Sequence, residues 1–418
     1  MKIIISSTPL SHMSPNKIRP TLTVLKRASW HQNIPGKLVA YEANSFCIIR
    51  EVFKGAIRGE SMWQVEEQDL ASISIGAGIL GTGGGGNPYI GMLRAREMIR
   101  RYGPVEVLSS DELRETDKIV CVGGIGAPTV GIEKIRGKQS YDALRALENH
   151  LGIKATALIS NEIGGSNSLE PLIPAAISGL PVIDADGMGR AFPEFHMKTF
   201  FVYGVPYVPM VLADEKGNIA VIPQALTGKW VERIARAITI QMGSVACYAL
   251  APMTAQQVRN TSVQGSLTLS KRLGDSVRKA NQAKSDPVRA ILEVNPGKIL
   301  FEGKISGIQR KTTQGFARGN VTIDGSGKFL DITMEIEFQN ENLIARIDDE
   351  IVCVVPDLIS IVDSEKGDPI TTELLRYGFR VTVLGFPAPE LWKTPEGLQV
   401  VGPSCFGYDV AYIPLEIE

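Results

Sequence analysis

The sequence has 418 residues, with 44 Lys or Arg against 45 Asp or Glu, so its formal net charge is −1. This balance provides no global attraction to nucleic acid or to an anionic membrane. The chain is also longer than one hydrophobic core usually supports. We therefore expect a globular protein of two domains that binds neither nucleic acid nor membranes.

Two further features of composition bear on location. No window holds the roughly 18 uncharged apolar residues that a membrane helix needs, and no secretory signal is evident at the N-terminus. The five cysteines are far apart and mostly lie in apolar runs, as buried thiols in a reducing compartment do. We expect a cytoplasmic protein.

Residues 1–61 carry scattered basic groups and show no sustained hydrophobic period. They are either an N-terminal extension of uncertain order or the product of a start codon upstream of Met62. We assign them no function.

From Met62 the pattern becomes regular and predicts an α/β domain over residues 62–250. Apolar, β-branched runs at 118–122, 155–159 and 180–183 predict parallel strands. The helices expected around them cover residues 66–80, 89–101, 141–150 and 168–178. Ligand sites in open α/β sheets lie beyond the carboxyl ends of the strands, so the turns after these runs are where we expect the site.

The rest of the chain predicts a helical connection and then a β-rich domain. Helices are expected over 230–249 and 254–282, with residues 251–296 as the connection. Short strands at 299–310, 318–323, 329–339 and 343–348 alternate with hairpin-type turns, which is typical of a small antiparallel barrel or sandwich in residues 297–418. The tail from Phe379 can pair with either domain.

Four consecutive glycines separate the first two expected helices. Their amides can approach a ligand closely and bind an anion or a developing oxyanion. No Lys-Ser or Lys-Thr pair follows, so the run is not a nucleotide-phosphate loop. The alternative is a flexible turn, although four glycines cost roughly 0.5–1 kcal/mol each relative to alanine and a turn normally uses one or two. The candidate substrate-binding residues here are Thr82, Gly83, Gly84, Gly85, Gly86 and Asn87.

A second cluster, Asp184, Asp186, Arg190, Glu194 and His196, follows the third apolar run directly. Neighbouring carboxylates can supply a base and an acid, histidine can shuttle protons near neutral pH, and arginine can hold a carboxylate-bearing substrate. We take the three acids and the histidine as candidate catalytic residues and Arg190 as a candidate substrate ligand. The alternative is a strand-end turn in which Asp184 caps a helix and Arg190 pairs with Glu194.

A divalent metal is also possible at this cluster, with Asp184, Asp186 and His196 as candidate ligands, although their spacing matches no specific signature. Glu162 and Asn167 follow another predicted strand and can face the same cleft, unless Asn167 only caps the next helix. Cys405 lies in a loop that would suit a nucleophile, but no adjacent base activates it, and a structural thiol is the simpler interpretation.

Taken in order, the segments 80–89, 160–167, 184–194 and 402–409 resemble the S-methyl thiohydantoin desulfurase domain family, which is associated with hydantoinases. The resemblance runs from about Met62 to the end and excludes residues 1–61. It implies an α/β sandwich domain followed by a β-barrel-like domain, that is, α/β plus β. It also implies hydrolysis at the ring carbon of an S-methylated thiohydantoin, which releases methanethiol and leaves a hydantoin.

For this reaction we expect Asp184 or Asp186, helped by His196 or a metal, to deprotonate water. The glycine amides or a protonated Glu194 would stabilise charge on the ring. The expected partners are a small cyclic substrate, further copies of the chain in a homo-oligomer and a hydantoinase-type protein. Two rival interpretations are a non-catalytic or regulatory subunit that binds a cyclic imide, and a nucleotide-dependent ring-opening subunit, against which the missing phosphate-loop lysine argues.

Overall fold

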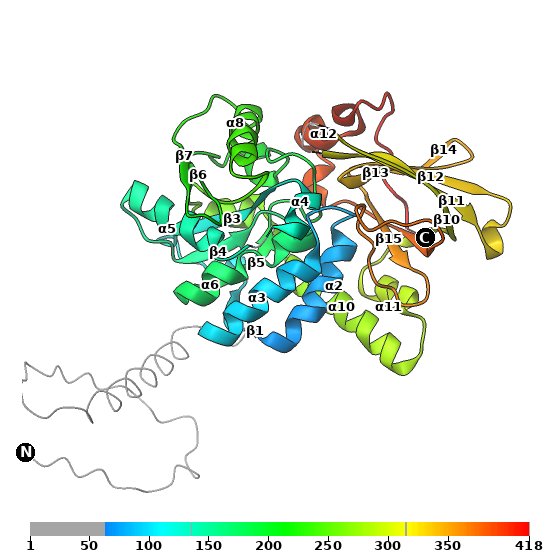
Figure 1. The fold of residues 1–418 in the computed structure, drawn as a ribbon, viewed down its shortest axis with the longest axis horizontal. Helices are drawn as coiled ribbons and strands as arrows, with labels where there is room; N and C mark the ends of the chain where they lie inside the picture. Colours follow the sequence, from blue (N-terminus) through cyan, green and yellow to red (C-terminus); the bar gives the residue numbers. More distant parts are fainter. Residues whose placement is uncertain (1–62, 135, 314–315, 418) are drawn as a thin grey trace, which may run out of the picture. The chain divides into compact units, whose positions relative to one another are not determined.

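Two β-sheets organise the part of the chain described by the computed structural model, residues 63–134, 136–313 and 316–417 (Figure 1). The expectations for residues 1–61 lie outside the described residues. The first sheet belongs to an α/β domain and the second to a β-rich domain, as the sequence predicts.

The first sheet has nine strands within the described ranges, in the order β1-β2-β5-β4-β3-β8-β6-β7, with β9 paired to β5. Its centre is parallel, because β2, β5, β4 and β3 run in one direction. The predicted parallel strands are thus confirmed. The strands are β1 (Trp63–Val65), β2 (Val105–Leu108), β3 (Ile119–Gly126), β4 (Ala157–Ser160), β5 (Val182–Asp186), β6 (Met210–Ala213), β7 (Ile219–Ile222), β8 (Val245–Leu250) and β9 (Val263–Gln264).

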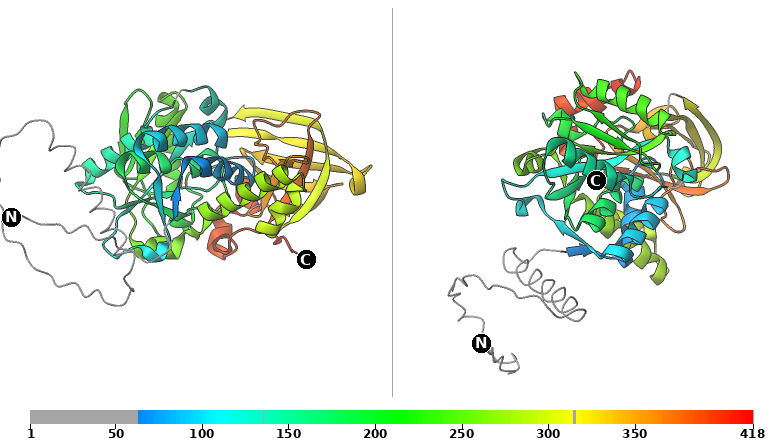
Figure 2. Two further views of the ribbon diagram at one scale, coloured as in Figure 1. Left: turned by 90° about the horizontal axis from the view of Figure 1, so that it is seen from below. Right: turned by 60° about the vertical axis from the view of Figure 1, so that its left-hand side comes forward.

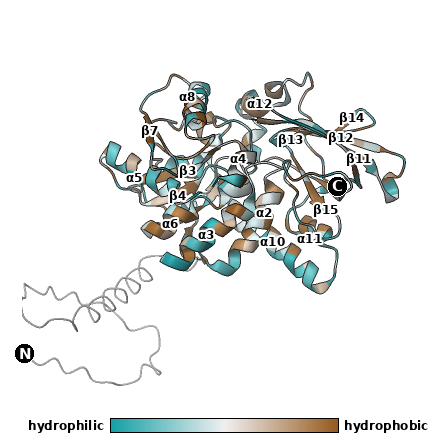
Figure 3. Ribbon diagram, viewed as in Figure 1, coloured by the Kyte–Doolittle hydropathy of each residue, from teal (hydrophilic) through white to brown (hydrophobic). Residues whose placement is uncertain are grey.

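Both faces of this sheet are covered. Along β3, Val120 and Val122 join one apolar core while Ile119 and Cys121 join a second core on the other face, as the alternation of a strand requires. The first core is covered by α2 (Leu70–Leu80), α3 (Pro88–Tyr102), α5 (Gln139–Leu151), α6 (Leu172–Ser178), α10 (Ser266–Ala283) and α11 (Pro287–Val294). The second is covered by α7 (Thr199–Val202), α8 (Gly228–Gln241) and α9 (Ala255–Thr261). Outer helices such as α3 and α5 carry both hydrophilic and hydrophobic stretches (Figure 3).

The second sheet is antiparallel, with the order β14-β13-β12-β11-β10-β16-β15. It curls into a half-barrel around its own apolar core, so that β13 and β14 also contact β15. Its yellow and orange strands lie beside the α/β domain in Figures 1 and 2. The strands are β10 (Lys298–Thr313), β11 (Phe316–Gly325), β12 (Thr333–Gln339), β13 (Glu341–Ile347), β14 (Glu350–Val354), β15 (Leu358–Asp363) and β16 (Arg380–Phe386). Short α4 (Pro128–Glu133) and α12 (Pro395–Val401) complete the α-helices of the described residues.

Two predicted helices are wrong in part. The helix expected over 230–249 ends at Gln241, and β8 follows, because Gly243 takes a positive φ of 81° and reverses the chain. The helix expected over 254–282 is interrupted by β9 and by Gly265, whose φ is 72°. Within the described ranges, no helix is both long and apolar enough to cross a membrane.

Candidate active site

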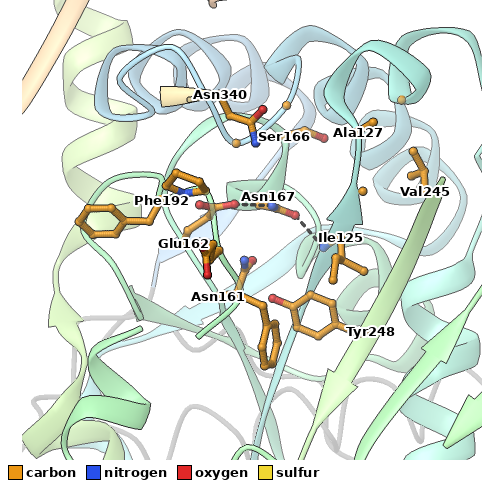
Figure 4. A pocket seen from close by; sticks show the side chains of 18 of the residues that line it. Ile125, Ala127, Asn161, Glu162, Ser166, Asn167, Phe192, Val245, Tyr248 and Asn340 are labelled. Atoms are coloured by element: carbon orange, nitrogen blue, oxygen red, sulfur yellow. Dashed lines mark hydrogen bonds between the residues drawn. The ribbon is translucent and has the colours of Figure 1, made fainter. Parts of the chain in front are cut away.

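A pocket of about 110 Å³ opens where the two domains meet. Its wall is formed by the end of the glycine run, the carboxyl ends of β3 and β4, the loop after β5, β8 and the turn between β12 and β13 (Figure 4). The site therefore lies beyond the carboxyl ends of parallel strands, where α/β sheets usually bind ligands. The polar and charged residues of the wall are Asn87, Arg136, Asn161, Glu162, Ser166, Asn167, Glu194, Lys198, Arg236, Tyr248, Asn340 and Glu341.

Glu162 is the buried carboxyl group of the pocket floor. Its Oε1 accepts a hydrogen bond from Asn167 Nδ2, and Asn167 Oδ1 in turn accepts one from the Gly124 amide at 2.7 Å (Figure 4). The turn that carries both residues is fixed by Ser160, whose hydroxyl donates to the Glu162 carbonyl. Burial raises the pKa of Glu162 to about 7, opposed by the Asn167 hydrogen bond and the charge of Lys198. A carboxyl group with this pKa suits proton transfer at neutral pH.

Lys198 is a fully buried ammonium group in an aromatic cage. Its Nζ donates to the Phe195 carbonyl at 2.6 Å and lies 3.9 Å from the centroid of the Phe195 ring, with Phe201 and Tyr248 within 5.5 Å. Burial lowers its pKa to about 8, and the nearby Cys121 and Glu162 act in the opposite direction. Lys198 is therefore mainly a cation at neutral pH, and its charge acts on Glu162 in the same pocket lining.

Glu341 enters the pocket from the β-rich domain, at the start of β13. Only 2% of its surface is exposed, and its Oε1 accepts a hydrogen bond from the Gly85 amide at 3.3 Å. Burial and the neighbouring Glu162 raise its pKa well above the ordinary value. The Arg190 charge opposes this shift.

Several buried polar atoms of the wall make no hydrogen bond to another described residue, among them Asn161 Oδ1, Tyr248 OH and Glu341 Oε2. Buried polar groups in native proteins are nearly always satisfied by protein, water or ligand. These atoms therefore indicate a binding site for a polar molecule that offers both donors and acceptors.

The glycine run has two structural roles, lining the pocket and contacting the β-rich domain. Gly85, Gly86 and Asn87 line the pocket, whereas Thr82 and Gly83 bind the β-rich domain through their carbonyls, which accept from the amides of Asn342 and Thr372 at 2.7 and 2.9 Å. The second half of the predicted substrate-binding segment therefore lines the pocket, whereas its first two residues form an interdomain contact.

Arg190 lies outside the pocket. Its guanidinium group donates five hydrogen bonds, to the Thr82 hydroxyl and to the carbonyls of Ala191, Asn342, Pro356 and Asp357. Because a guanidinium group has five N–H donors, none is left for a substrate carboxylate. The structure thus uses Arg190 to join the domains, and the arginines that do face the pocket are Arg136 and Arg236.

The two aspartates are also directed away from the pocket. Asp184 accepts from the amide of Thr268 at 3.0 Å and from its hydroxyl, and so caps the first turn of α10. Asp186 Oδ2 accepts from the amides of Ile163, Met188 and Gly189, which fixes the loop after β5. Burial raises the pKa of Asp186 to about 6.

Glu194 lines the pocket. His196 is not among the lining residues, but its Nδ1 lies 3.3 Å from Glu194 Oε2. Burial lowers the pKa of His196 to about 4, while burial and Glu232 raise that of Glu194. The structure does not bring the proposed metal ligands Asp184, Asp186 and His196 together, and the described residues contain no cluster of three or more His, Cys, Asp or Glu suited to a metal. Cys405 is exposed and is not part of the pocket wall.

Sequence reasoning missed Lys198, Tyr248 and Glu341. Lys198 is the single Lys or Arg between Arg190 and Lys216 and precedes the mostly apolar stretch 200–213, which is a usable signal because buried lysines are rare. Tyr248 fell in a stretch predicted as helix, and Glu341 in a predicted hairpin turn of the other domain. Nothing in the sequence around these two residues indicates that they line a pocket.

Comparison with known proteins agrees with this architecture. Residues 68–224 match the S-Me-THD-like N-terminal domain and residues 227–415 match the S-Me-THD-like C-terminal domain. The chain belongs to the S-Me-THD-like family. The pocket is thus built from both domains of the family, because Glu162 and Lys198 lie in the first match and Tyr248 and Glu341 in the second.

A solved structure of a protein from Chromobacterium violaceum is similar at a TM-score of 0.71 and 24% identity, covering 85% of this chain and 100% of that protein. At this identity the likeness shows a shared fold. No curated protein matches the sequence.

Proposed function

We propose that this protein hydrolyses an S-methylated thiohydantoin-type ring and releases methanethiol and a hydantoin. The family name suggests a desulfurase-like enzyme. The observation that carries the proposal is the pocket itself, whose lining contains both the Glu162 carboxyl group, with a pKa of about 7, and the buried cation of Lys198, whose charge acts on it.

The proposed base is Glu162 in place of Asp184 or Asp186, whose carboxylates are occupied outside the pocket. Glu162 would remove a proton from water, and the hydroxide would add to the ring carbon that bears sulfur. Lys198 would keep the carboxylate ionised. Collapse of the tetrahedral intermediate would expel methanethiolate, which takes up the proton held by Glu162.

The ring is a polar molecule with both N–H donors and carbonyl acceptors. Asn161 Oδ1 can accept from a ring N–H, and the Tyr248 hydroxyl and the amides of Gly85 and Gly86 are on the same wall. Ile125, Phe192 and Val245 provide apolar surface for the S-methyl group. The wall thus has the mixed character that a small heterocycle requires.

The test is a thiol assay for methanethiol with the full chain and an S-methyl thiohydantoin. The Glu162→Gln variant should lose about 10²–10⁴-fold in turnover, the usual contribution of a general base. Asp184→Asn should keep the wild-type rate. No release by the wild-type chain would refute the reaction, and loss in Asp184→Asn with retention in Glu162→Gln would refute the assignment of the base.

A further inference from the structure

We propose that Glu341, which the β-rich domain inserts into the pocket, is the acid that protonates the ring nitrogen, and that Gly84 is glycine in order to leave room for it. The inference rests on the proposed hydrolysis and adds a catalytic residue from the other domain. Four contacts and one steric relationship carry it.

The turn that presents Glu341 is fixed against the glycine run. The Asn342 amide donates to the Thr82 carbonyl at 2.7 Å, and the Thr372 amide donates to the Gly83 carbonyl at 2.9 Å. The Thr372 hydroxyl also donates to the Asn340 carbonyl at 2.7 Å. Asn342 is therefore tied to the glycine run directly and Asn340 through Thr372, which leaves little freedom in where the carboxyl group of Glu341 lies.

The glycines of the run are required for two different reasons. Gly83, Gly85 and Gly86 have φ values of 90°, 75° and 82°, which side chains rarely adopt. Gly84 is not in this region of φ. A Cβ at position 84 would instead lie 1.9 Å from Glu341 Oε1. The three atoms closest to such a Cβ all belong to the Glu341 side chain, which therefore excludes a side chain at position 84.

The two oxygens of Glu341 have different surroundings. Oε1 accepts from the Gly85 amide, while Oε2 is buried in the pocket wall without a partner from another described residue. A protonated Oε2 can donate to a ring nitrogen of a bound substrate, because a neutral carboxyl group has one O–H donor. The charged groups that face it are Glu162 after β4 and Arg190 after β5, and the pocket wall adds Glu194, Lys198, Arg136 and Arg236.

The proton transfers then balance. Glu162 takes one proton from water as the hydroxide adds to the carbon, and Glu341 gives its proton to the ring nitrogen. When the C–S bond breaks and the carbonyl forms, Glu341 recovers a proton from the new hydroxyl group. Glu162 gives its proton to methanethiolate, so both carboxyl groups return to their starting states.

The test compares Glu341→Gln with Glu337→Gln, a matched change of a partly exposed glutamate on β12 that pairs with Arg346. We expect Glu341→Gln to lower turnover by about 10²–10⁴-fold and to abolish the fall of rate at high pH, whereas Glu337→Gln keeps both. Wild-type turnover with an unchanged alkaline limb in Glu341→Gln would overturn the proposal.

Gly84→Ala provides a second variant that leaves the carboxyl group in the protein. Because the colliding atoms belong to a side chain, the substitution should displace the carboxyl group more than the backbone. Turnover should fall at least tenfold, and the double variant Gly84→Ala/Glu341→Gln should be no slower than Glu341→Gln alone, as expected of coupled residues. Additive losses would contradict the steric relationship.

An infrared measurement tests whether Glu341 is protonated, independently of whether the protein catalyses the proposed reaction. At pH 7.5, the spectrum of the wild-type chain should contain a protonated carboxyl signal that is lost in Glu341→Gln and kept in Glu337→Gln. If that signal is not lost, Glu341 is not the acid even when methanethiol is released. If the signal is lost but the wild-type chain releases no methanethiol, the reaction fails while the protonated state of Glu341 stands.

Discussion

Lys198 Nζ lies 3.9 Å from the centre of the Phe195 ring and donates to the carbonyl of the same residue at 2.6 Å. One residue thus holds the ammonium group with both its ring and its backbone. This contact keeps a cation inside the protein, where its charge acts on Glu162 with little screening by water.

Replacing this cation should change the pH dependence of catalysis. In Lys198→Met the Glu162 carboxylate loses a favourable charge, so its pKa rises from about 7 and the acid limb of the kcat/KM profile moves to higher pH. The measurement is kcat/KM of methanethiol release between pH 5 and 9. Lys279→Met, at an exposed position of α10, should leave the limb unchanged. An unmoved limb in Lys198→Met would show that the two groups are not coupled.

Arg190→Leu should destabilise the fold and not weaken substrate binding selectively. Removal of the guanidinium group leaves four buried carbonyls without this donor, and since each unsatisfied buried acceptor costs about 1–3 kcal/mol, we expect the free energy of unfolding to fall by at least that amount. Urea denaturation measures it, with Arg289→Leu, at an arginine that is 79% exposed, as the control. A stable Arg190→Leu protein with a raised KM would instead restore the role in substrate binding.

Asp184→Ala tests the cap on α10. Loss of the acceptor for the Thr268 amide and hydroxyl should cost about 1 kcal/mol, the typical value for a helix N-cap. Chemical unfolding gives this free energy, and the methanethiol assay run on the same sample should give the wild-type rate. A large loss of turnover without a loss of stability would indicate that Asp184 acts in catalysis.

His196 predicts how stability depends on pH. Its pKa is about 4 in the folded protein against an ordinary value of 6.5, because burial disfavours the charged form. As the pH falls below 6.5, His196 binds a proton in the unfolded chain but not in the folded chain. The free energy of unfolding therefore decreases progressively down to pH 4. The His196→Gln variant should therefore lose less stability than wild type between pH 7 and 4. If urea denaturation at pH 7 and pH 4 shows that both proteins lose the same free energy of unfolding, the lowered pKa of His196 is contradicted.

The sequence predicted the location of the site better than its chemistry. The parallel strands at 118–122 and 155–159 and the glycine run were recognisable because hydrophobic period and glycine content are local properties. Glu162 and Asn167 were therefore found at the pocket, on the turn after β4. The direction of the side chains at the end of β5 was not predictable, because Asp184 and Asp186 accept hydrogen bonds from backbone amides of other segments.

Local sequence patterns could not predict that Glu341 lies in the pocket. Its turn was predicted as a hairpin turn, and the structure has β12 and β13 on either side of it. The contact with Gly85 joins residues separated by 256 positions, and no periodicity in either segment encodes it. Arg190 was misassigned for the same reason, since its partners at 342, 356 and 357 are distant in the chain.

The close approach of Gly84 to Glu341 has an evolutionary consequence. Among homologous sequences, a residue with a side chain at position 84 should occur with a shorter residue at position 341, because both volumes cannot occupy the same space. The two family domains would then not diversify independently, and exchange of a C-terminal domain between distant relatives would require the glycine run to be exchanged with it.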